Sequence, residues 1–218
     1  MKVAALSSAA FNHQETDLSH RFAALARVAA LTAFAATAMS AHAANLIKDG
    51  GFEVPIVPVG GFTKFVTGEV FGPWTVVGVP GDVAIVSTTF VQNGIAFKAK
   101  AGKQWLDMTG FLSDRATGVA QTVKTVPGQS YVLTFSVGNV VDPSNVFGTT
   151  SSVDVQINGV QQMRATYSGG VNNELRWKRF STSFVATAKL TTVAFLNADP
   201  LDDNSNGLDA VTLTPAAE

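Results

Sequence analysis

The sequence predicts an all-β protein in which two antiparallel sheets pack as a β-sandwich, with the jelly roll as the expected topology. The first observation is a period of two, since bulky apolar residues occupy every second position along 131–137. The second is a set of turn signals between such runs, namely Pro-Gly at 80–81 and 127–128 and Asn-Gly at 158–159 and 206–207. No segment after residue 44 has a convincing helical spacing.

The expected strands are rich in Val, Thr and Phe, residues that favour a pleated, half-buried surface. Ile157-Asn-Gly-Val160 predicts a tight hairpin. The loop Asn139–Ser151 is the longest polar loop; it is either a connector or a binding loop, and Asn145 is its candidate ligand contact. In chain order, the expected strands cover residues 74–79, 83–86, 103–107, 118–123, 131–137, 153–157, 180–186, 190–196 and 208–213.

Residues 1–43 predict a secretory signal peptide with an extended n-region. A charged stretch ends at Arg27, an apolar run covers 28–39, and Ala41 and Ala43 supply the small side chains that cleavage requires. The run is shorter than the roughly 18 residues of a membrane span. We expect a single mature domain over 44–218 that is secreted or periplasmic. Either a genuinely long leader or a start codon assigned too far upstream explains the length of the n-region.

Composition excludes several classes of function. Cysteine is absent, so stability must come from burial of apolar side chains, among them 15 Phe. The net charge of -1 offers no basic field for nucleic acid. All three histidines, His13, His20 and His42, lie in the expected leader. The mature chain therefore lacks Ser-His-Asp and thiolate catalysis, and we expect a non-catalytic protein.

Both ends of the mature chain carry motifs. The chain opens with Asn45-Leu-Ile-Lys-Asp-Gly-Gly-Phe-Glu53 and closes with Asn206-Gly-Leu-Asp-Ala-Val-Thr-Leu213. In this pattern the chain resembles galactose-binding-like β-sandwiches, found in carbohydrate-binding modules and in secreted bacterial and plant cell-wall proteins, many of unassigned function. The resemblance covers nearly the whole mature chain, through the intervening motifs Gly72-Pro-Trp74, 105–110, 119–123 and 127–135.

The resemblance also implies a metal. In several proteins of this fold a calcium ion joins the first and last strands, held by a Glu of the opening motif and an Asp of the closing motif. The corresponding residues are Glu53 and Asp209, and backbone carbonyls at Asp49 or Gly51 can complete the oxygen shell that calcium requires. Alternatively, Glu53 and Asp209 cap turns or pair with a lysine.

The implied function is recognition of carbohydrate or of a cell-wall or extracellular polymer. Sugar binders stack aromatic rings on pyranose faces, and Tyr167 and Trp177 are the candidates, while Trp74 and Trp105 match positions expected in the core. No row of aromatic residues alternates on one face, so a structural or adhesion component of a matrix remains an alternative. A glycosidase based on two carboxylates is the third hypothesis.

Overall fold

Regular structure in the described part of the chain consists of β-strands, with no helix among them. The computed structural model describes residues 44–111, 115–142, 146–171, 173–200 and 205–217. The expected signal peptide over 1–43 lies outside these residues. Within them, no helix is long and apolar enough to cross a membrane.

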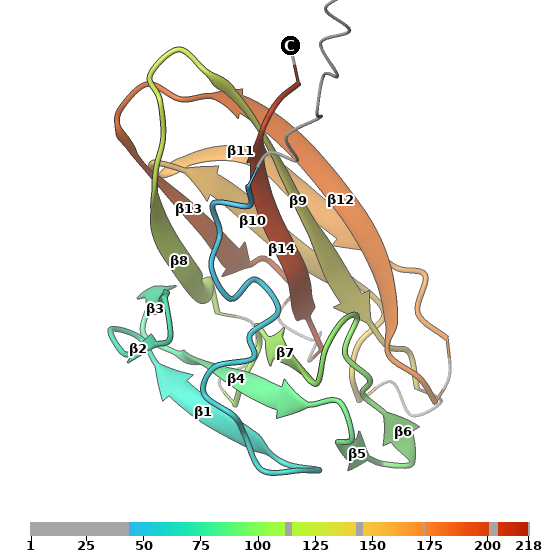
Figure 1. Cartoon of the computed structure of the whole chain (residues 1–218). Helices are drawn as coiled ribbons and strands as arrows, with labels where there is room; N and C mark the ends of the chain where they lie inside the picture. Colours follow the sequence, from blue (N-terminus) through green and yellow to red (C-terminus); the bar gives the residue numbers. More distant parts are fainter. Residues whose placement is uncertain (1–43, 112–114, 143–145, 172, 201–204, 218) are drawn as a thin grey trace, which may run out of the picture. The chain divides into compact units, whose positions relative to one another are not determined.

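Two antiparallel six-stranded sheets build the domain (Figure 1). A separate hairpin joins β5 (Val91–Gln92) to β6 (Ile95–Ala96). The first sheet has the order β1 (Phe62–Val66), β4 (Asp82–Ser87), β7 (Gln104–Asp107), β14 (Gly207–Pro215), β9 (Ser130–Asn139), β12 (Arg176–Val185). The second has the order β11 (Val160–Tyr167), β10 (Ser151–Ile157), β13 (Leu190–Asn197), β8 (Thr117–Lys124), β3 (Trp74–Gly78), β2 (Val70–Phe71).

The main hydrophobic core gathers side chains of both sheets, as the period of two predicts. On β9, Leu133 and Phe135 are fully buried, and Phe135 meets Phe195 of β13 with ring centroids 5.1 Å apart. Trp74 of β3 is also fully buried, which agrees with the expected core position. The prediction of a two-sheet antiparallel sandwich is confirmed.

Each expected strand corresponds to a strand of the structure, and further strands add to them. The hairpin at Asn158-Gly159 joins β10 to β11, and both turn residues have positive φ, 52° and 79°, as a tight two-residue turn requires. The strands that the sequence pattern did not reveal are β1, β2, β5, β6 and β11.

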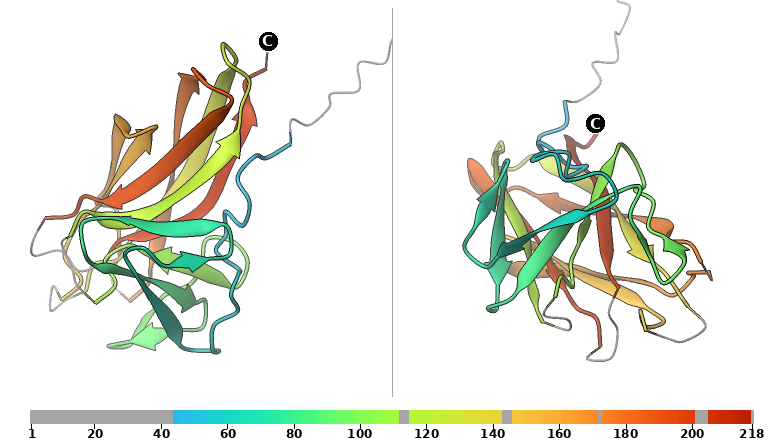
Figure 2. Two further views of the ribbon diagram at one scale, coloured as in Figure 1. Left: turned by 90° about the vertical axis from the view of Figure 1, so that its left-hand side faces the viewer. Right: turned by 90° about the horizontal axis from the view of Figure 1, so that it is seen from below.

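The opening segment of the domain runs alongside the last strand, so the two end motifs meet (Figures 1 and 2). Leu46 N–H donates to the Leu213 carbonyl at 2.8 Å, and Val211 N–H donates to the Gly50 carbonyl at 2.8 Å. Gly50 permits this approach, because a Cβ there would lie 2.0 Å from the Val211 oxygen.

A bulge in β14 sets the direction of the Asp209 side chain. The pairing of β14 with β9 shifts register between Asp209 and Thr212, and Ala210 within the bulge has a φ of 53°. Bulges re-aim side chains that a regular strand would place on the core or the solvent face. Here the Asp209 carboxylate reaches the backbone of residues 100 and 101.

Candidate functional site

The first candidate site is a carboxylate cluster where the opening segment meets β14. Asp209 is fully buried, and Glu53 is half-buried. Gly51 lies between their carboxylates: a Cβ on it would be 3.8 Å from Asp209 Oδ1 and 4.0 Å from Glu53 Oε1. The structure thus brings together three of the four residues predicted for calcium, and it places Asp49 beside them.

Backbone amides of the segment Lys100–Gln104 orient the two carboxylates. Asp209 Oδ2 accepts hydrogen bonds from the amides of Lys100 and Ala101 at 2.8 and 3.0 Å. Glu53 Oε1 accepts from the amides of Lys103 and Gln104 at 2.7 and 3.1 Å. Gly102 stands between these pairs with a φ of 69°, and a Cβ there would lie 2.0 Å from Glu53 Oε1. The cluster therefore fixes this segment to both ends of the domain.

Burial, and to a smaller extent the charge of Glu53, disfavours the charged forms of Asp209 and Asp49. Burial raises the pKa of Asp209 to about 7, and the negative charge of Glu53 adds to the shift, while the hydrogen bonds from the segment's amides oppose it. Burial likewise raises the pKa of Asp49. The ion pairs found among the described residues join Lys64 to Asp82, Arg164 to Asp154 and Arg176 to Glu174. None of them neutralises the cluster.

The donor set fits a cation only in part. Asp49 is engaged as a turn residue: its carboxylate accepts the amides of Glu53 and Val54, and its carbonyl accepts the Trp74 indole N–H at 2.9 Å. Glu53, Asp209 and the Gly51 backbone remain. No group of three or more His, Cys, Asp or Glu side chains suited to a metal occurs among the described residues. Backbone and water oxygens would have to supply most of a calcium shell of six to eight.

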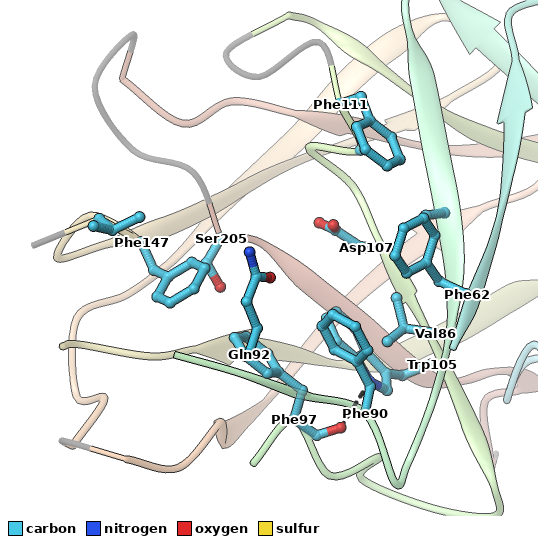
Figure 3. A pocket seen from close by; sticks show the side chains of 13 residues that line it. Phe62, Val86, Phe90, Gln92, Phe97, Trp105, Asp107, Phe111, Phe147 and Ser205 are labelled. Carbon is cyan, nitrogen blue, oxygen red and sulfur yellow. Dashed lines mark hydrogen bonds between the residues drawn. The ribbon is translucent and has the colours of Figure 1, made fainter. Parts of the chain in front are cut away.

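The second candidate site is an aromatic pocket of about 470 Å³ next to β1, β4 and β7. On β7, Trp105 and Asp107 are two residues apart and so share the face of the strand that lines the pocket. Figure 3 shows the Asp107 carboxyl between the rings of Phe62 and Phe147 in that view. Six of the lining residues are aromatic: Phe62, Phe90, Phe97, Trp105, Phe111 and Phe147.

The rings support one another as a continuous wall. Phe62 packs with its ring centroid 5.7 Å from that of Phe90 and 5.3 Å from that of Phe111. Phe97 links the deeper rings, with centroids 5.6 Å from Phe90, 6.2 Å from Trp105 and 5.3 Å from Phe147. Tilted and edge-to-face pairs of this kind contribute about 0.5–1.5 kcal/mol beyond area burial. The rings at the mouth stay accessible, since Phe62 is 39% and Phe111 60% exposed.

Polar groups in the pocket are few. The Asp107 carboxylate accepts hydrogen bonds from the amide and hydroxyl of Thr109 at 3.1 and 2.7 Å. Burial raises the pKa of Asp107 to about 6, and the charge of Asp82 contributes, while the bonds from Thr109 act against the rise. The Ser205 hydroxyl is buried without a hydrogen-bond partner, and the exposed Gln92 amide completes the polar lining. A buried hydroxyl without a partner is costly unless a ligand or water satisfies it.

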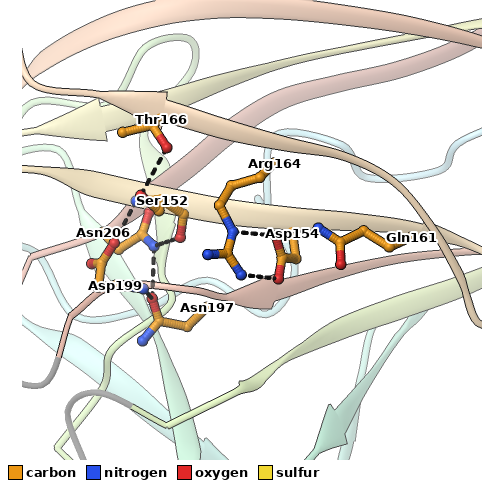
Figure 4. A network of polar contacts seen from close by, with 8 residues as sticks. All are labelled: Ser152, Asp154, Gln161, Arg164, Thr166, Asn197, Asp199 and Asn206. Carbon is orange, nitrogen blue, oxygen red and sulfur yellow. Dashed lines mark hydrogen bonds and ion pairs between the residues drawn. The ribbon is translucent and has the colours of Figure 1, made fainter.

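A buried amide network holds Asn206, just before β14 (Figure 4). The preceding residue, Ser205, lines the pocket. Asn206 Nδ2 donates to the Ser152 carbonyl at 2.6 Å and to Asn197 Oδ1 at 2.8 Å. The Ser151 hydroxyl donates to the Ser205 carbonyl. These bonds tie β14 to β10 and β13, strands of the opposite sheet, at the point where the chain enters the pocket wall.

Two of the ligand candidates from the sequence, Tyr167 and Trp177, do not line the pocket. Tyr167 lies half-buried at the end of β11, and its hydroxyl donates to the Gly169 carbonyl at 2.9 Å. Trp177 of β12 covers Gly138 and Gly207, and its indole N–H donates to the Lys98 carbonyl at 2.9 Å. It also backs the pocket wall, with its ring 5.9 Å from that of Trp105. Asn145 lies outside the described residues.

Sequence reasoning missed most of the pocket. Its loop candidate, Asn139–Ser151, does contribute Val146 and Phe147. The phenylalanines at 62, 90 and 111 carry a weak signal, because they stand in or next to turn-rich segments, where a core residue is less expected. Phenylalanine is so frequent in this chain that the signal does not stand out.

Fold and pocket together define a β-sandwich domain with an aromatic pocket beside the edge of one sheet and a carboxylate cluster at its chain ends. A family model described as "Protein of unknown function (DUF642)" matches residues 45–214, and the chain belongs to this family. The match spans both end motifs.

Two solved structures are similar to this chain, and the first of them shares its fold. The Stig cyclase Fisc from Fischerella sp. TAU, solved in complex with (3Z)-3-(1-methyl-2-pyrrolidinylidene)-3H-indole, is 18% identical, with 80% of this chain and 98% of that chain covered and a TM-score of 0.55. The CBM22-1 xylan-binding domain of Paenibacillus barcinonensis Xyn10C is 16% identical, with 74% and 99% covered and a TM-score of 0.43. At these identities the likeness concerns the fold alone.

Proposed function

We propose that this protein is a secreted, non-catalytic binding module whose aromatic pocket receives a carbohydrate ring of a polysaccharide or cell-wall polymer. The observation that supports this most is the pocket itself, in which six aromatic rings surround a carboxylate, a free hydroxyl and an amide. Aromatic faces stack on the apolar C–H face of a sugar, and the polar groups bind its hydroxyls.

Removing an aromatic ring at the mouth is the first test. Phe111→Ala and Phe62→Ala should each weaken binding to the recognised sugar about tenfold, because a lost stacking contact of about 1.4 kcal/mol corresponds to that factor. Both rings are accessible, so we expect folding to survive. Saturation binding to a panel of polysaccharides and oligosaccharides, followed by calorimetric titration, measures the effect.

Tyr167→Ala is the matched control, because Tyr167 is the aromatic candidate that lies outside the pocket. Loss of binding in this variant with no loss in Phe62→Ala and Phe111→Ala would contradict the assignment of the pocket. Absence of saturable retention on any polysaccharide, together with self-association of the protein, would favour the alternative of a matrix or adhesion component.

A structural calcium ion between Glu53 and Asp209 forms the second part of the proposal. The two carboxylates converge near Gly51 without a basic partner, and a cation would offset both the burial and the smaller repulsion from Glu53 that raise the pKa of Asp209. The two carboxylates hold the segment 100–104, which in the sequence lies between Phe97 and Trp105, two aromatic residues of the pocket. When bound, calcium would supply electrostatic cross-linking, and Glu53 and Asp209 would hold both chain ends and the pocket wall together.

Calcium should therefore raise the thermal stability of the protein. At 100 times the dissociation constant the gain is about 2.7 kcal/mol, which for a domain of this size is about 5–10 °C in melting temperature. Glu53→Gln keeps an acceptor oxygen for the segment's amides but removes the charge, and it should abolish most of the gain. Melting curves with calcium and with excess chelator measure this, and Glu174→Gln, which alters a surface ion pair, is the control.

The gain should depend on pH in a defined direction. The pKa of Asp209 is about 7 in the folded chain, whereas its ordinary value is 3.8. Between these two pH values, Asp209 is protonated in the folded chain and charged in the unfolded chain. Without calcium, this group makes stability fall as the pH rises from about 4 to about 7. Calcium must displace the proton, so its stabilising effect should grow over the same range and level off above it. An equal effect at both ends of the range, or in Glu53→Gln, would contradict the site.

A further inference from the structure

The aromatic pocket contains an acidic group with no basic partner. Asp107 ends β7, half-buried, and its carboxylate accepts hydrogen bonds from Thr109 and from the Gly110 amide. No lysine, arginine or histidine among the described residues forms an ion pair with it. Burial raises the pKa of Asp107 only to about 6, so at neutral pH the pocket carries a negative charge surrounded by rings. A carboxylate in such a place gains most from a ligand that brings a positive charge.

The aromatic rings also favour a positively charged ligand. The face of an aromatic ring carries partial negative charge and attracts an ammonium group within about 6 Å of its centroid. Lys64 shows this preference at the edge of the pocket: its ammonium nitrogen lies 5.2 Å from the centroid of Phe111 and 3.5 Å from Asp82 Oδ2. A carboxylate and a phenylalanine ring thus already hold one ammonium here. Asp107 and the rings of Phe62 and Phe90 offer the same combination inside the pocket.

We propose that the pocket selects a sugar bearing a protonated amine, an amino sugar, whose ammonium group lies against Asp107 and the surrounding rings. This inference rests on the proposed carbohydrate-binding function and specifies its ligand. The hydroxyl of Ser205, which is 4% exposed and has no partner, then serves a sugar hydroxyl. A neutral sugar would leave the Asp107 charge without a counter-ion, and an N-acetylated one would lose the positive charge that the pocket favours.

The test compares ligands that differ in charge, at neutral pH, by calorimetric titration of the whole protein. Glucosamine is compared with glucose and N-acetylglucosamine, and choline with its uncharged isostere 3,3-dimethylbutan-1-ol. We expect glucosamine to bind at least about tenfold tighter than glucose. In Asp107→Asn, which keeps the size of the side chain and its acceptor for Thr109, the two sugars should bind within about twofold of each other.

Two further variants keep the test independent of folding. Gln92→Glu adds a carboxylate at an exposed pocket position and should increase the preference for glucosamine over glucose. Asp154→Asn removes a carboxylate on β10 that pairs with Arg164 outside the pocket, and it should leave the preference unchanged.

The possible outcomes distinguish the amino-sugar inference from the proposed carbohydrate-binding function. Equal affinity for glucose, N-acetylglucosamine and glucosamine, or a preference unaffected by Asp107→Asn and Gln92→Glu, would overturn the amino sugar and leave carbohydrate binding in place. Binding of choline above its isostere, with no binding of any sugar, would overturn the carbohydrate function and the amino sugar with it.

Discussion

Replacing Trp74 with alanine is expected to lower the free energy of unfolding by about 3–5 kcal/mol, the range typical of a large aromatic side chain removed from a core. Trp74 is fully buried, with its ring centroid 5.2 Å from that of Phe52 and 6.3 Å from that of Phe195. Its indole N–H also donates a hydrogen bond to the Asp49 carbonyl in the opening segment. The variant therefore loses packing in the core and the anchor of the opening segment at once.

Trp74→Phe separates the two contributions. Phenylalanine keeps most of the apolar ring but lacks the N–H donor, so we expect a smaller loss, part of it the cost of an unpaired Asp49 carbonyl, about 1–3 kcal/mol. Denaturant titration of the wild type and both variants measures the differences. A loss below about 1 kcal/mol for Trp74→Ala would show that the opening segment holds its place without this residue, contrary to the packing described above.

Gln104→Met is expected to have the second largest effect, about 3 kcal/mol, because one buried side chain serves three backbone groups that would each lose a partner. Gln104 is 3% exposed. Its Nε2 donates to the carbonyls of Phe52 and Pro55 at 2.7 and 3.0 Å, and its Oε1 accepts the Val57 amide at 2.7 Å. Methionine has a similar shape but offers no equivalent hydrogen bonds, so the loss measures the bonds more than the packing.

Gln121→Met provides the matched control. Gln121 is 6% exposed and binds the backbone of a single residue, Lys48. Its Oε1 accepts the Lys48 amide N–H at 2.8 Å, and its Nε2 donates to the Lys48 carbonyl at 2.9 Å. With two bonds in place of three, we expect a smaller loss, about 2 kcal/mol. Denaturation midpoints of both variants give the comparison. A larger loss in Gln121→Met than in Gln104→Met would contradict the importance assigned to the bonds around Gln104.

Gln104 also connects the two candidate sites. It ends the segment held by Asp209 and Glu53, and the next residue, Trp105, lines the pocket. A disturbance at Gln104 is therefore expected to reach both the carboxylate cluster and the aromatic wall. This arrangement gives a physical reason why a cation at the chain ends would matter for a ligand bound elsewhere in the domain.

The sequence by itself determined most of the strands, and the family resemblance of its end motifs indicated that the chain ends meet. Alternation along 131–137 identified β9, because one of its faces is fully buried while Val132 and Thr134 on the other face are only half-buried, and Asn158-Gly159 identified the hairpin after β10. The end motifs pointed to Glu53 and Asp209, which the structure places on either side of Gly51. Local pattern was less informative at β1, where Phe62 and Val66 are exposed and Phe65 is half-buried, so apolar residues occur on both faces.

Only the tertiary structure decided the pocket. Its members come from β1, β4, β5, β7 and the chain around 97, 111, 147 and 205, which meet because of strand order, and the period of two specifies the face of a residue but not the neighbour of a strand. The alternating run around Phe135 predicted its burial, whereas the sequence did not show that Phe111, which is 60% exposed, lies in a pocket. The charge of Asp107 became informative only once the described residues showed six rings around the pocket and no ion pair with Asp107, since a carboxylate acquires its chemical role from its environment.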